Sequence, residues 1–163
     1  MVTQDLPARL SLVLVALLAL HGPATAQTAA PMTVSRAWAR AMPPGAAVGA
    51  VYFTLDNAGP ADTLLRLDSP VAGHIEMHSM TVRQDVMQMR LLPTVPVPAH
   101  GRVVFEPGDM HVMLLDLPRP LQEGEHFALT LNFQHGPAVQ TTVVVLGLGA
   151  AGPPPAGHDG TTH

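Results

Sequence analysis

Two histidines and two methionines in the middle of the chain have side chains and spacings that suit a shared metal ion. His78 is followed after ten residues by Met89, and after twenty-one more by His111, with Met113 two positions further on. Imidazole nitrogen binds copper in either oxidation state, whereas the soft thioether sulfur of methionine selects Cu(I). We therefore predict a Cu(I) site formed by His78, Met89, His111 and Met113.

Methionine is concentrated around these positions. The sequence contains nine methionines, and those between residues 77 and 113 are Met77, Met80, Met87, Met89, Met110 and Met113. Methionine commonly fills gaps in hydrophobic cores, and we adopt that interpretation for Met32 and Met42. For the six clustered methionines, which lie beside histidines, we favour metal binding over core packing.

Alternation of residue types predicts that the ligands lie on β-strands. His111 and Met113 share one face of an extended segment over residues 111–117, about 7 Å apart along the strand. Residues 74–80 are compatible with a helix, which would place His74 and His78 at an i, i+4 spacing that can bind zinc. Gly73 before the segment, its short length and the β-branched residues after it favour a strand.

A β-hairpin is expected to bring the other two ligands together. Residues 87–91 form its second predicted strand, and residues 83–85 suit the turn. If the turn lies around Gln84, His78 and Met89 face each other near the middle of the hairpin. The hairpin then provides one half of the site, and residues 111–113 provide the other.

The remaining sequence predicts an all-β fold. Further strands are expected over residues 34–40, 50–56, 63–67, 102–106, 125–133 and 138–146. Three prolines within residues 93–98 predict a stiff connector rather than a strand. No apolar repeat of 3.6 residues is sustained, and turn signals recur about every ten residues, which is typical of a β-sandwich or barrel.

Composition excludes several classes of protein. The chain of 163 residues has no cysteine and a formal net charge of −4, and all eight of its basic residues are arginine. Without cysteine there is no disulfide scaffold, thiol redox centre or blue-copper His2Cys site. A basic surface for nucleic acid or a polybasic membrane patch is not expected either.

The ends of the chain differ in character from the middle. Residues 1–26 contain Arg9, an apolar run over residues 10–20 and a small-residue site ending at Ala26, which predicts a cleaved secretory signal peptide. The apolar run is shorter than the about 20 residues that a membrane span needs. We expect a single periplasmic β domain over residues 27–147, without a membrane span, and a disordered tail rich in Gly and Pro over residues 148–163.

The spacing of the four candidate ligands resembles a known motif. It matches the H-x10-M-x21-H-x-M pattern of the periplasmic copper chaperones called PCu(A)C. Flanking residues are also similar, including Ala37-Trp38-Ala39-Arg40, Pro43-Pro44-Gly45, Glu76-Met77-His78, Val86-Met87-Gln88-Met89-Arg90 and Pro107-Gly108. The resemblance covers residues 34–146 and has no departure at the four ligand positions.

The resemblance implies properties that the residues alone do not show. It implies a cupredoxin-like Greek-key β-barrel or sandwich with the metal near its surface. It also implies transfer of Cu(I) toward the copper centres of cytochrome c oxidase, with the copper-accepting oxidase subunit and Sco-type proteins as partners. Some relatives bind Cu(II) through a C-terminal extension, for which this tail offers only His158 and His163.

The expected activity is binding and transfer of copper by a monomer, without catalysis. Neutral ligands leave Cu(I) its single charge, so a partner with cysteine ligands can remove the ion by stepwise exchange. One alternative is a periplasmic copper storage or homeostasis protein with the same site. Another is a non-metal β-sandwich module for adhesion or carbohydrate binding, for which Trp38 and Tyr52 are the candidate exposed aromatic residues.

Overall fold

A computed structural model describes residues 32–83 and 86–153. The predicted signal peptide, the centre of the predicted hairpin turn and the last ten residues of the predicted tail lie outside these ranges. Within them, no helical segment has the length and apolarity that crossing a membrane requires.

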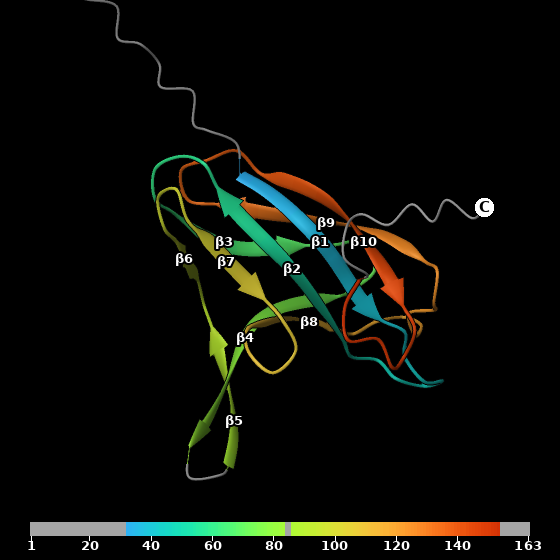
Figure 1. Ribbon diagram of the computed structural model, residues 1–163. Coiled ribbons are helices and arrows are strands. Elements are labelled where there is room, and N and C mark those ends of the chain that lie inside the picture. The colour runs from blue at the N-terminus through green and yellow to red at the C-terminus, as the bar shows by residue number, and fades with distance from the viewer. Residues whose placement is uncertain (1–31, 84–85, 154–163) are drawn as a thin grey trace, which may run out of the picture.

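The described residues form ten β-strands and contain no helix, so the all-β prediction is confirmed (Figure 1). Segment 74–80 is a strand as predicted, whereas the strand predicted over residues 111–117 ends at Leu115, because Asp116 has a φ of 55°. The bounds are β1 Met32–Arg40, β2 Gly49–Asn57, β3 Asp62–Asp68, β4 His74–Arg83, β5 Val86–Leu92, β6 Val95–Val97, β7 Arg102–Phe105, β8 His111–Leu115, β9 His126–Phe133 and β10 Val139–Leu146.

The strands form one continuous hydrogen-bonded sheet that curves around the core. Its order is β5-β4-β8-β2-β1-β10-β9-β3-β6, and β7 pairs with β2 next to β8. The β1–β10 pair is parallel, and the other pairs are antiparallel. Figure 1 shows the β4–β5 hairpin extending away from the body of the sheet, where β5 forms the edge.

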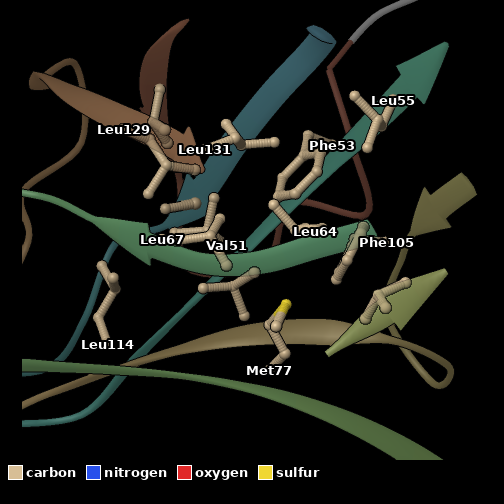
Figure 2. Packing of buried hydrophobic residues seen from close by; sticks show 14 of the residues in the cluster. Val51, Phe53, Leu55, Leu64, Leu67, Met77, Phe105, Leu114, Leu129 and Leu131 are labelled. Atoms are coloured by element: carbon tan, nitrogen blue, oxygen red, sulfur yellow. The ribbon is translucent and has the colours of Figure 1, made fainter. Parts of the chain in front are cut away.

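The core consists of side chains that alternate inward along the strands. In β9, every second residue from Phe127 to Phe133 is buried, as the sequence pattern predicts. Figure 2 shows side chains of β2, β3, β4 and β9 meeting in the interior. Burial of each large apolar side chain contributes about 1.5–3 kcal/mol. The largest fully buried residues are Phe53, Phe105, Leu55, Leu64, Leu114, Leu129, Leu131, Val51, Val97, Val112, Val143 and Val145.

The prediction of a stiff connector over residues 93–98 is wrong. Residues 95–97 form β6 and pair with β3, with Pro96 opposite Thr63. Val95 and Val97 are buried, whereas Pro96 is exposed. Proline is tolerated here because β6 is an edge strand.

The segment after β10 is held against β1 as far as the structure describes it. The Arg40 Nε–H donates a hydrogen bond to the Ala150 carbonyl oxygen at 2.7 Å. Arg36 Nη2 donates to the Pro153 carbonyl oxygen at 2.9 Å. The prediction of a disordered tail over residues 148–163 stays a prediction for residues 154–163.

Asp62 links the start of β3 to the β9–β10 connection through hydrogen bonds of its carboxylate. Its replacement by alanine should therefore destabilise the fold. Its carboxylate accepts backbone hydrogen bonds from Thr63, His135 and Gly136. Desolvation raises the pKa of this carboxyl, but the three donors outweigh it and the net shift is downward. We expect Asp62→Ala to lower the free energy of unfolding by about 1–2 kcal/mol.

The dependence on pH follows from the sign of that shift. A lowered pKa in the folded protein means that the stabilisation is present above the unfolded pKa, about 3.9, and is lost as pH falls through the folded pKa. Urea unfolding at pH 7 and pH 3 measures the effect, with exposed Glu123→Ala as the control. Equal stabilities of Asp62→Ala and the control at pH 7 would contradict this role.

Candidate metal centre

Strand β4 lies between β5 and β8, and this order brings the candidate ligands to one region of the sheet (Figure 1). His78 of β4 pairs directly with His111 of β8, and Glu76 pairs with Met113. On the other side of β4, Met80 pairs with Met89 of β5. Because side chains alternate along strands, all of these residues point to the same face.

The predicted pairing of His78 with Met89 is wrong by two residues of β5. His78 pairs with Leu91, so Met89 lies diagonally from His78 rather than opposite it. Pairing His78 with Met89 would centre the turn between residues 83 and 84, whereas the observed register centres it between residues 84 and 85. Diagonal neighbours on one face are about 7–8 Å apart, within reach of long side chains.

The candidate ligands lie on the outward face of the sheet. On the opposite face Met77 is 4% exposed and Val112 is fully buried in the core. Met110 also packs against that core. The core-packing interpretation, which the sequence disfavoured for the clustered methionines, therefore holds for Met77 and Met110.

The two histidines are sheltered, whereas one methionine is open to solvent. The His78 side chain is 14% exposed and His111 is 5% exposed. Met89 is 53% exposed, and Met113 is partly buried. The arrangement combines a sheltered imidazole pair with a thioether that is open to solvent.

Glu76 fixes the tautomer of His78. The His78 Nε2–H donates to Glu76 Oε2 at 2.8 Å, and His74 Nε2 lies 3.2 Å from Glu76 Oε1. The hydrogen bond from His78, followed by that from His74, lowers the pKa of the Glu76 carboxyl. An ionised carboxylate only accepts hydrogen bonds, so in neutral His78 the proton resides on Nε2 and the lone pair on Nδ1.

The Nδ1 atom of His78 is a buried acceptor without a partner. In the part of the chain that the structure describes, it is the single buried side-chain nitrogen or oxygen that lacks a hydrogen bond. Leaving such an atom unsatisfied costs about 1–3 kcal/mol. A metal ion bound to the lone pair would remove this cost.

His111 is oriented in the complementary way. Its Nδ1–H donates to the Asp109 carbonyl oxygen at 3.0 Å, which leaves the lone pair on Nε2. Histidines that bind metals commonly donate their other ring N–H to a carboxylate or a backbone carbonyl. The rings of His78 and His111 have centroids 5.9 Å apart and planes inclined by 24°, so the two imidazoles lie side by side.

Histidine and carboxylate groups alone do not complete this site. Among residues 32–83 and 86–153, no group of three or more His, Cys, Asp or Glu side chains is placed to hold a metal ion. The register places the thioethers of Met113 and Met89 on the same face as the imidazole pair, where they are the candidate additional donors. Such a mixed set of nitrogen and sulfur donors suits Cu(I).

The alternative of a carbohydrate-binding surface is contradicted by the burial of its two candidate residues. Trp38 is 4% exposed and Tyr52 is 7% exposed. Their ring centroids are 4.7 Å apart, and the Arg40 guanidinium lies over both rings. These aromatic side chains therefore pack against β1 and β2 and do not form an exposed platform.

Comparison with known proteins agrees with this architecture. The family model described as "LpqE-like: Putative lipoprotein LpqE-like" matches residues 32–145. The chain belongs to the LpqE-like family, which is of the PCuAC type. The resemblance to PCu(A)C proteins found in the sequence is thereby confirmed.

Members and structural neighbours of the LpqE-like family cover most of the chain. A putative lipoprotein of Leifsonia xyli subsp. xyli (strain CTCB07) is 29% identical over 133 residues, covering 78% of this chain and 79% of that protein. The solution structure of CuI-DR1885 from Deinococcus radiodurans is 31% identical, with a TM-score of 0.58, covering 76% of this chain and 83% of that one.

A second solved structure establishes the fold. The apo PmoF2 PCuAC domain superposes with a TM-score of 0.63 at 22% identity, covering 75% of this chain and 94% of that domain. The predicted fold class is confirmed, because the chain has the cupredoxin-like β-sandwich of PCuAC domains.

Proposed function

We propose that this protein is an extracytoplasmic Cu(I)-binding metallochaperone whose ligands are His78, Met89, His111 and Met113. The observation that carries the proposal is the unpartnered, buried Nδ1 of His78, directly across the β4–β8 ladder from His111. Both imidazoles already donate their other N–H group. They can bind a cation without releasing a proton.

The ligand set favours transfer over permanent storage. Thioether and imidazole are neutral, so they hold Cu(I) less tightly than the thiolates of a cysteine-containing acceptor. Met89 is exposed and lies at the edge of the sheet, where an acceptor can displace it first. The similar DR1885 structure carries Cu(I), which supports the same ion for this chain.

We also propose where the copper is delivered. The PCuAC resemblance supports delivery in the periplasm toward the copper centres of cytochrome c oxidase, directly or through Sco-type proteins. We propose a monomeric carrier, exported by the predicted signal peptide at residues 1–26. A Cu(II) site involving His158 and His163 is part of this proposal only as a secondary feature of the tail.

Titration with Cu(I) against a competing chelator, at a series of pH values and without oxygen, tests the proposal. We expect one tightly bound Cu(I) per chain at pH 7.5. Affinity should fall as pH drops from 8 to 5, because protons compete with the metal ion for the imidazole nitrogens. Affinity that is unchanged between pH 5 and pH 8 would contradict the histidine ligands.

A further inference from the structure

The hairpin formed by β4 and β5 has one face rich in thioether groups. Met80 pairs with Met89 across the hairpin. Met87 lies two residues before Met89 and therefore points to the same side. The opposite face carries polar side chains, namely Ser79, Thr81, Gln88 and Arg90. The methionines are thus sorted to the face that carries His78.

Two of these methionines are open to solvent. Met87 is 64% exposed and Met89 is 53% exposed, and Val82 and Leu91 beside them are 67% and 53% exposed. The hairpin projects from the body of the protein, and β5 pairs only with β4 (Figure 1). An ion arriving from solvent meets these thioethers before it reaches His111, which is 5% exposed.

The spacing of the three methionines allows them to share an ion. Residues directly across a ladder have Cβ atoms about 4.5–5.5 Å apart, and diagonal neighbours are about 7–8 Å apart. Met80 is directly across from Met89, and Met87 is diagonal to Met80. Methionine has three rotatable side-chain bonds and adapts readily, so three sulfur atoms can converge on one soft cation such as Cu(I).

We propose that Met80, Met87 and Met89 form an outer Cu(I) site, from which the ion passes inward to His78, His111 and Met113. This inference rests on the proposed function. Met89 belongs to both sites and stays bound during the transfer. The bonds from copper to the sulfurs of Met80 and Met87 break, and bonds to two ring nitrogens and the sulfur of Met113 form.

The transfer is a ligand exchange without redox chemistry. Copper remains Cu(I) and every ligand is neutral, so the charge of the complex stays constant. No proton has to leave, because His78 Nδ1 has no hydrogen-bond partner and His111 Nε2 carries a lone pair in the tautomer set by Asp109. The path runs along one face of the sheet, from the solvent-exposed hairpin to the sheltered imidazole pair.

Nuclear magnetic resonance of the methionine methyl groups in the full protein locates both sites. The first equivalent of Cu(I), added without oxygen, should shift the methyls of Met89 and Met113 and the two imidazoles. Excess Cu(I) should then shift the methyls of Met80 and Met87, the two outer thioethers that the first ion leaves free. Met77 is an internal control, because it lies on the same strand but is buried on the opposite face.

The two possible failures are distinguishable. If the first equivalent leaves the signals of His78 and His111 unchanged, the proposed function is wrong. If those signals move but excess Cu(I) affects Met80 and Met87 no more than Met77, the outer site is wrong and the proposed function stands.

Loading kinetics test the transfer step. The double variant Met80→Leu, Met87→Leu preserves side-chain volume and removes both outer sulfurs. With a coloured Cu(I)–chelator complex as donor, we expect loading to be several-fold slower than in the wild type. Affinity for the first equivalent is measured on the same samples, to separate slow loading from weak binding. Wild-type loading rates in this variant would overturn the proposal.

A matched control removes two methionines elsewhere. Met32 and Met42 are partly buried against the core on other strands and loops. The double variant Met32→Leu, Met42→Leu should load at the wild-type rate. If this control slows loading as much as the hairpin variant does, removal of any two methionines slows loading. The outer site is then rejected.

Discussion

Replacing His111 by alanine is expected to weaken Cu(I) binding more than replacing a residue that only supports a ligand, such as Glu76. The change removes a ring nitrogen whose lone pair is already oriented by the Asp109 carbonyl. Outer-shell changes at metal sites typically cost about 10–100-fold in affinity, and loss of a ligand should exceed this range. Chelator competition at pH 7.5 measures the dissociation constant.

His111 is also buried, so the variant needs a check on folding. Met113→Leu keeps the side-chain volume and generally costs less than about 1.5 kcal/mol of stability, yet it removes one sulfur ligand. We expect it too to weaken Cu(I) binding, with an unchanged circular dichroism spectrum. Exposed His126→Ala, on β9, is the matched histidine control. If Met113→Leu binds Cu(I) as tightly as the control, Met113 is not a ligand.

Glu76→Gln is expected to lower Cu(I) affinity although Glu76 is not a proposed ligand. The carboxylate accepts the His78 Nε2–H at 2.8 Å and so leaves Nδ1 free for the ion. A glutamine amide is neutral and accepts the hydrogen bond more weakly than a carboxylate does. The imidazole of His78 therefore becomes a weaker electron donor to the ion. We expect a loss of about 10–100-fold, typical of such supporting residues.

The site of the proton on His78 separates this role from a general surface effect. Nitrogen-15 spectra of the imidazole should show protonated Nε2 in the wild type and a mixture of tautomers in Glu76→Gln. Glu123→Gln, at an exposed position, serves as the control. A Glu76→Gln protein with wild-type affinity and an unchanged tautomer would remove Glu76 from the account.

The sequence predicted the strands and the candidate ligands because both depend on local periodicity. Alternation placed His111 and Met113 on one face, and the observed register agrees. The pairing of His78 required the hairpin register, which depends on the turn. An error of one residue at the centre of that turn moved the expected partner from Leu91 to Met89.

Other features depended on contacts between distant segments. Residues 95–97 form a strand because β3 offers an open edge, which overrides the unfavourable local preference of three prolines. The support that Asp109 gives to His111 comes from a backbone carbonyl, which no residue type reveals. Glu76 had a visible signal, since alternation places it on the same face as His74 and His78, but its role needed the observed hydrogen bonds.

Copper K-edge X-ray absorption of the protein loaded with one equivalent of Cu(I) identifies the donor atoms around the ion. We expect a first shell containing both imidazole nitrogen and thioether sulfur. The sulfur contribution should fall in Met113→Leu and in Met89→Leu, and should be unchanged in Met42→Leu. A first shell without sulfur, or one that neither ligand substitution changes, would contradict the proposed centre.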